Sequence, residues 1–197
     1  MKKGLLILFL FFCLFALVGC NSKKTIEYRT NLQNVTDKML ENASEVEEML
    51  NKYSAVWSYS IESKGAIPVG EMATVTGLEQ DVINEHFEIN TIGNIPNDFS
   101  TNIYSLNSYY SETGKLEELE NASTEIKDAI KDLNDPPEDY KKVYDEVLDM
   151  FTFTEEYIGM AINPDGSLQS FNENRATLSS DIINKYKRIE ALMPSVD

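Results

Sequence analysis

The chain has 197 residues and carries 33 Asp and Glu against 17 Lys and Arg, for a net charge of −16. So acidic a protein should be repelled by the phosphate backbone, which excludes nucleic-acid binding as its function. Its 2 cysteines both lie within the first 20 residues, so disulfides and thiolate metal sites are excluded from the rest of the chain.

The N-terminus has the composition of a secretion signal. Lys2 and Lys3 precede an apolar run from Leu5 to Val18, and polar residues resume at Asn21. A helix needs about 20 apolar residues to cross a bilayer, whereas a signal peptide uses a shorter run that ends at small residues. The pattern therefore predicts a signal rather than a permanent span.

The apolar run ends in a tetrad that is typical of one class of signal. Its residues are Leu17, Val18, Gly19 and Cys20. The tetrad resembles the bacterial lipobox, and this resemblance implies a thioether-linked diacylglyceryl group and an N-acyl group on Cys20, with cleavage just before it. An ordinary cleaved signal, or an uncleaved anchor in which Cys20 is incidental, is the alternative.

The resemblance implies a mature protein that its lipid holds at the extracytoplasmic face of the cell membrane. Residues 1–19 would be the signal peptide and residues 20–24 a short tether. Cys13 would leave with the signal. The loss of Lys2 and Lys3 would leave 15 basic against 33 acidic residues, for a net charge of −18. No cofactor is expected besides the covalent lipid.

Hydrophobic spacing predicts a long first helix over residues 25–64. Apolar residues recur at steps of three and four, which places them on one helix face. They are Leu32, Val35, Met39, Val46, Met49, Tyr53 and Val56, with Ala43, Leu50 and Trp57 beside them. Gly65 and Pro68 should end this helix. Asn42 lies on the same face, where we expect partial exposure; pairing across the bundle is the alternative.

The next segment, residues 66–97, is interrupted repeatedly by glycine and proline. Thr76 and Glu79 fit a capping box, in which each side chain satisfies a free amide at the start of a helix. This pattern predicts a short helix that ends at about Asn90, although residues 82–92 also have strand character.

The second half of the chain is predicted to consist of amphipathic helices. Their apolar stripes cover residues 98–114, 116–133, 137–162 and 168–193. Asp98 can cap the first helix, Gly114 can end or bend it, and Pro137 suits a first helical position. The turn at residues 163–166 and the stop at Pro194 bound the last helix.

Short links between long amphipathic helices imply that consecutive helices are antiparallel neighbours. The sequence therefore predicts an all-α fold, an antiparallel up-and-down bundle of four to five main helices. Residues 25–197 are long enough to bury a core and should form a single domain.

Residues with catalytic chemistry are scarce. His86 is the only histidine, so the two Glu-x-x-His pairs of a di-iron bundle cannot form. A Ser-His-Asp triad assembles in space, but no Gly-x-Ser-x-Gly motif supports one here. We interpret His86 as a structural or surface residue and expect no enzyme activity.

The acidic residues also have ordinary structural interpretations. Asn163 to Gly166 has part of a calcium-loop pattern, but Ala161 and Asn172 occupy the first and last ligand positions, so we interpret it as a turn. The runs at residues 45–48 and 117–120 alternate with core positions, which favours solvated helix faces over acid and base pairs. No metal site is expected.

Aromatic residues are the remaining feature that could mark a functional surface. Tyrosine and tryptophan bury apolar area while keeping a polar group, which suits interfaces and pockets as well as cores. The candidate partner or pocket surface consists of Trp57, Tyr59, Tyr104, Tyr109 and Tyr110. Packing within the bundle core is the alternative.

The lipobox and the helical body together resemble the small surface lipoproteins of Gram-positive bacteria, a general type that implies no specific functional family. The resemblance favours a non-enzymatic interaction module at the cell surface, whose partner is another envelope protein or an incoming molecule. A ligand- or solute-binding lipoprotein with a pocket between helices is the alternative. An extracytoplasmic hydrolase that uses His86 is a third hypothesis.

Overall fold

The computed structural model describes the backbone of residues 2–195 and the side chains of residues 24–195. The side chains of Cys13 and of the lipobox, residues 17–20, lie outside the described part. In chain order the elements are α1 (Lys2–Glu62), β1 (Ile67–Pro68), α2 (Val69–Thr76), α3 (Gln80–His86), β2 (Asn94–Ile95), α4 (Phe99–Glu112), α5 (Lys115–Asp132), a 3-10 helix η1 (Glu138–Tyr140), α6 (Lys141–Ile162) and α7 (Leu168–Leu192).

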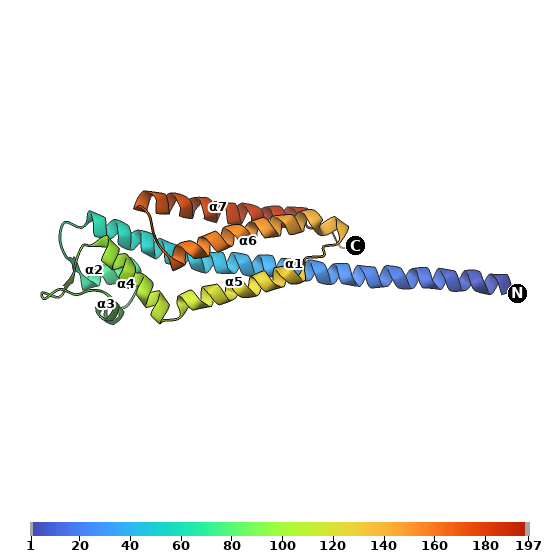
Figure 1. The fold of residues 1–197 in the computed structure, drawn as a ribbon, viewed down its shortest axis with the longest axis horizontal. Helices are drawn as coiled ribbons and strands as arrows, with labels where there is room; N and C mark the ends of the chain where they lie inside the picture. The colour runs from blue at the N-terminus through green and yellow to red at the C-terminus, as the bar shows by residue number, and fades with distance from the viewer. Residues whose placement is uncertain (1, 196–197) are drawn as a thin grey trace.

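The long helices form an antiparallel up-and-down bundle (Figure 1). α4 and α5 return together along α1, α6 runs outward again, and α7 comes back along α6. The all-α bundle of four to five main helices is therefore confirmed. We call the end made by residues 57–104 and 163–167 the tip. The base is the opposite end of the bundle, where Arg29 Nη1 donates to the carbonyl of Pro194 at 2.9 Å.

The core is built on α1, which contacts α4, α5, α6 and α7. Every residue predicted for its apolar face is buried. Asn42 is only 5% exposed, so the expectation of partial exposure is wrong. It lines a small cavity together with Leu119 and Ile126 of α5, and its Nδ2 has no hydrogen-bond partner within residues 24–195. The spacing on α1 alone could not show how far α5 would extend over this position.

The segment between α1 and α4 differs most from its prediction. Thr76 opens no helix; it is the last residue of α2, and its hydroxyl donates to the carbonyl of Met72 at 2.9 Å. Gly77, with φ +69°, ends α2 as a left-handed cap. The short helix that follows, α3, ends at His86 rather than at Asn90. Residues 82–92 contain no strand; β2 follows them and pairs antiparallel with β1.

Most other helix boundaries follow their local signals. The carboxylate of Asp98 accepts from the amides of Ser100 and Thr101, which caps α4 as predicted. Pro137 precedes η1, so the helix begins one residue later than predicted and with a tighter turn. α7 has a capping box that was not predicted: the hydroxyl of Ser167 accepts from the amide of Ser170, whose own hydroxyl accepts in return.

The bend between α4 and α5 depends on Gly114, whose φ is +78°. Gly114→Ala should destabilise the bundle by about 1 kcal/mol, because an L side chain enters the left-handed region at roughly that cost. A Cβ atom there would meet nothing within 4 Å, so no clash adds to it. Gly65→Ala is a matched control, since its Cβ also meets nothing and its φ is not positive. Urea unfolding measures both variants, and equal losses would contradict the prediction.

Candidate functional site

A groove of about 310 Å³ lies at the tip, between the end of α1, the start of α4 and the turn that joins α6 to α7. We call it the tip groove. It is lined by Trp57, Phe99, Ser100, Ile103, Tyr104, Asn107, Asn163, Pro164, Asp165 and Gly166. Two of the five predicted aromatic residues, Trp57 and Tyr104, therefore meet here.

The aromatic side chains of the tip groove have different roles. Trp57 is 4% exposed and stacks on Phe99, with ring centroids 5.7 Å apart and an interplanar angle of 11°. It also packs against Phe171, with centroids 5.6 Å apart. Phe99 is 39% exposed and Tyr104 is 72% exposed. Trp57 is thus a core residue that supports the groove, while Phe99 and Tyr104 offer the accessible apolar surface.

Asn107 fixes the wall of the tip groove. Its Nδ2 donates to the carbonyl of Ile162 at 3.1 Å and to the hydroxyl of Tyr53 at 2.9 Å. The carbonyl belongs to the last turn of α6, where the helix itself leaves acceptors unpaired. One amide therefore links α4, α6 and α1 beside the groove.

Exposed apolar side chains are concentrated at the tip. Of the eight large hydrophobic residues that are exposed within residues 24–195, four belong to it. They are Ile61, Ile92, Phe99 and Tyr104. Single exposed apolar residues are ordinary, but several on one end of a molecule are typical of an interaction surface.

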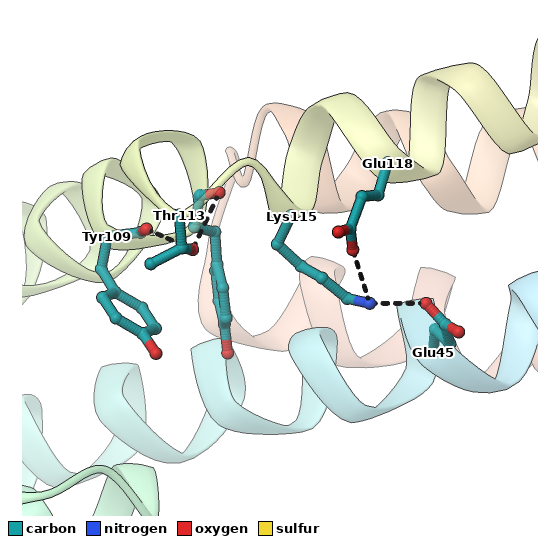
Figure 2. Close-up of polar contacts among 6 residues, drawn as sticks. Glu45, Tyr109, Thr113, Lys115 and Glu118 are labelled. Atoms are coloured by element: carbon teal, nitrogen blue, oxygen red, sulfur yellow. Dashed lines mark hydrogen bonds and ion pairs between the residues drawn. The ribbon is translucent and has the colours of Figure 1, made fainter.

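A second cavity, of about 490 Å³, lies where α4 bends into α5 against α1 (Figure 2). We call it the elbow cavity. It is lined by Glu45, Glu48, Met49, Lys52, Tyr109, Tyr110, Thr113 and Lys115. Tyr109 and Tyr110 therefore lie here and not at the tip groove. Tyr59 lines neither cavity; its hydroxyl donates to the carboxylate of Glu71 on α2. The five predicted residues do not form one surface.

Lys115 is held between two carboxylates at the elbow cavity. Its Nζ lies 2.7 Å from Oε2 of Glu45 and 3.3 Å from Oε2 of Glu118. Figure 2 shows both contacts as dashed lines. The hydrogen bond to Glu45 is the main cause that raises the pKa of Lys115. Glu48 and Lys52, by contrast, have no ion-pair or hydrogen-bond partner among the described residues. The cavity therefore presents one unpaired charge of each sign.

Tyr110 lines the elbow cavity, and its buried hydroxyl is an unsatisfied donor. It is 5% exposed, and its hydroxyl has no hydrogen-bond partner in residues 24–195. Its ring meets Tyr53 edge-on, with centroids 5.6 Å apart. Burial raises the pKa of the Tyr110 hydroxyl, so the group keeps its proton and stays a donor. An unpaired buried hydroxyl costs about 1–3 kcal/mol, which makes it unusual in a folded protein.

His86 lies next to the elbow cavity without lining it. Its ring meets Tyr109 edge-on at 5.1 Å, and its Nδ1 is 3.5 Å from Oε2 of Glu112. No serine among the described side chains is hydrogen-bonded to it. The hydrolase hypothesis therefore gains no nucleophile here.

Two further features of the described chain bear on chemistry and membrane contact. No group of three or more His, Cys, Asp or Glu side chains within residues 24–195 is arranged to hold a metal ion. Residues 163–166 form the turn between α6 and α7. Among the described residues, no helix has the length and apolar character that a membrane crossing requires.

Glu47 was predicted to lie on a solvated face, but it is only partly exposed. Its Oε2 accepts from the hydroxyl of Tyr157 at 2.9 Å and from that of Ser179 at 2.7 Å. Glu45 and Glu48 are exposed as predicted. Glu47 lies four residues after buried Ala43, and this spacing is the signal that could have identified it.

Comparison with known proteins yields no relative: no protein family, curated protein or solved structure matches the chain significantly. Inferences about the tip groove and the elbow cavity therefore depend on their own geometry and chemistry.

Proposed function

We propose that the protein is a lipid-anchored lipoprotein of the extracytoplasmic face of the membrane, and that it acts as a non-enzymatic interaction module whose tip groove binds another envelope protein. The observation that carries this proposal is that the tip groove is lined by Trp57, near the C-terminal end of α1. This end of α1 is the one farthest from the start of the helix (Figure 1). With a rise of 1.5 Å per residue, the part of α1 from Thr25 to Glu62 would hold the groove about 55 Å beyond the tether.

The chemistry of the tip groove indicates the kind of partner. Phe99 and Tyr104 would receive an apolar side chain. Asp165 is the only charged residue in the lining, and the mature chain would carry a net charge of −18. A partner with basic residues around its apolar anchor would be steered to this surface, whereas an acidic one would be repelled.

Photo-crosslinking on intact cells tests the proposal. A photoreactive amino acid at position 104 should capture a partner that the same group at position 148 does not. Leu148 is a matched control because it is 39% exposed but lies on α6, outside the tip groove. Recovery of the same proteins from both positions, or of none above an unrelated lipid-anchored protein, would contradict the proposal.

Affinity measurements on the captured protein complete the test. Tyr104→Ala should raise the Kd for the purified partner by at least about tenfold, because truncating a central aromatic contact commonly has an effect of this size. Leu148→Ala should leave the Kd unchanged. An unchanged Kd for Tyr104→Ala would remove the tip groove from the interaction.

A further inference from the structure

We propose that the elbow cavity is a binding site for a small zwitterionic ligand, a free amino acid or a short peptide, and that it is separate from the tip groove. The cavity volume of about 490 Å³ falls within the range that is usual for small-molecule sites. Its lining combines apolar Met49 with hydroxyl groups and with charges of both signs.

The charges of the lining define the ligand. Glu48 and Lys52 lie four residues apart on α1, so they project from the same face of the helix. Neither has an ion-pair partner among residues 24–195, although both line the cavity. An ammonium group of the ligand would pair with Glu48, and its carboxylate would pair with Lys52. Both charges would then be satisfied without disturbing the bridge from Lys115 to Glu45.

Ligands of a single charge fit the elbow cavity less well. A simple anion would meet the carboxylates of Glu45 and Glu48, and a simple cation would meet the ammonium groups of Lys52 and Lys115. A ligand that brings a charge next to a side chain of the same sign is repelled, which opposes binding. A molecule that carries both charges avoids either conflict.

The neutral groups of the cavity also support a ligand. Tyr110 is 95% buried, and its hydroxyl lacks any partner in the described chain. Because the hydroxyl itself is inaccessible from the cavity, a bound molecule would satisfy it only after a small shift of the ring. Thr113 and Lys115 flank Gly114, which is the N-cap residue of α5. Gly114 has no side chain to cap the free backbone amides of the first turn of α5. Such amides favour a carboxylate. The ligand's carboxylate therefore belongs at this end of the cavity, beside Lys52.

Calorimetric titration of the protein, purified from membranes in detergent, tests the assignment. The probes are the standard free amino acids and the dipeptide alanyl-alanine. At least one should bind saturably, and its N-acetylated and C-amidated forms should each bind at least about tenfold more weakly, because each loses one charge-assisted contact. If no probe binds saturably, or if either blocked form binds as tightly as its parent, the proposal is wrong.

Substitutions locate the site and separate it from the tip groove. Glu48→Gln and Lys52→Gln should each weaken probe binding by about tenfold. Lys187→Gln, at an exposed lysine of α7, should have no effect. Tyr104→Ala should also leave probe binding unchanged, so failure of the tip-groove proposal would not affect this one. If Lys187→Gln and Lys52→Gln weaken probe binding equally, the effect comes from net charge alone and the site is not located at Lys52.

Tyr110→Phe distinguishes a ligand-binding hydroxyl from a structural one. The substitution keeps the buried ring and removes only a group that has no partner in the described chain. The unfolding midpoint should therefore stay the same or rise, while probe binding weakens several-fold. A lower midpoint with unchanged binding would show that the hydroxyl serves the fold and would exclude it from the site.

Discussion

Cys20→Ala should abolish the incorporation of labelled fatty acid and release the protein from the membrane fraction. If the lipobox assignment is right, Cys20 carries the thioether, and no other cysteine follows it in the chain. Each buried methylene of an acyl chain contributes about 0.8 kcal/mol, so two or more chains hold a protein stably, whereas the acidic body has no affinity of its own for an anionic surface. Metabolic labelling with a palmitate analogue, followed by fractionation, measures both effects.

The chain contains its own control for this experiment. Cys13→Ala removes the other cysteine from within the apolar run, where the lipobox assigns it no lipid. Labelling and membrane retention should persist in this variant. Labelling that survives in Cys20→Ala, or that disappears only in Cys13→Ala, would overturn the assignment of the anchor.

Trp57→Ala should destabilise the protein by about 3–5 kcal/mol, the usual cost of truncating a buried tryptophan. Trp57 is 4% exposed and supports both Phe99 and Phe171. Domains are commonly stable by only about 5–15 kcal/mol, so this variant would lose a large share of its folded stability.

Tyr104→Ala is the matched control, because Tyr104 lines the same groove but is 72% exposed. Its effect on the free energy of unfolding should stay within about 0.5 kcal/mol. Urea unfolding compares the two variants, and similar losses would contradict the distinction between support and contact surface. It also follows that binding tests of the tip groove should use Tyr104 and avoid Trp57.

The long helices could be predicted because their signals are local. The steps of three and four from Leu32 to Trp57 depend only on helical geometry, and every one of these residues is buried. Asp98 starts α4 through its own side chain, and Gly114 allows the bend before α5 through its own backbone conformation. None of these features requires knowledge of what packs against the helix.

The remaining errors concern contacts between distant segments. Thr76 and Gly77 fit the start of a helix as well as its end, and only the packing of α2 against α1 decides between them. Asn42 and Glu47 lie at the edges of the apolar face of α1. Their reduced exposure depends on α5, which lies beside Asn42, and on α7, whose Ser179 donates to Glu47. Hydrophobic spacing within α1 carries no information about that coverage.

The candidate site could be predicted only in part. Aromatic composition indicated Trp57 and Tyr104, which do share the tip groove, but it also included Tyr59, which does not. The groove needs Phe99 and the turn at Pro164, whose approach to α1 depends on how the helices are arranged in the bundle. Tyr109 and Tyr110 were also indicated, and they line the elbow cavity. Its charged residues were not predicted, since Lys52 and Lys115 are ordinary surface lysines until the bend at the end of α4 brings them together.

The chain runs from the base to the tip and back twice, which has a practical consequence. Arg29 and Pro194 are in contact, so both ends of the folded body lie at the base. The tip then consists entirely of internal segments joined to fixed helix ends. Lengthening the turn at residues 163–167 should cost little, about 0.6 kcal/mol for each doubling of its length. The same body would serve as a display scaffold for foreign peptides, with a C-terminal reporter placed at the opposite end from the displayed sequence.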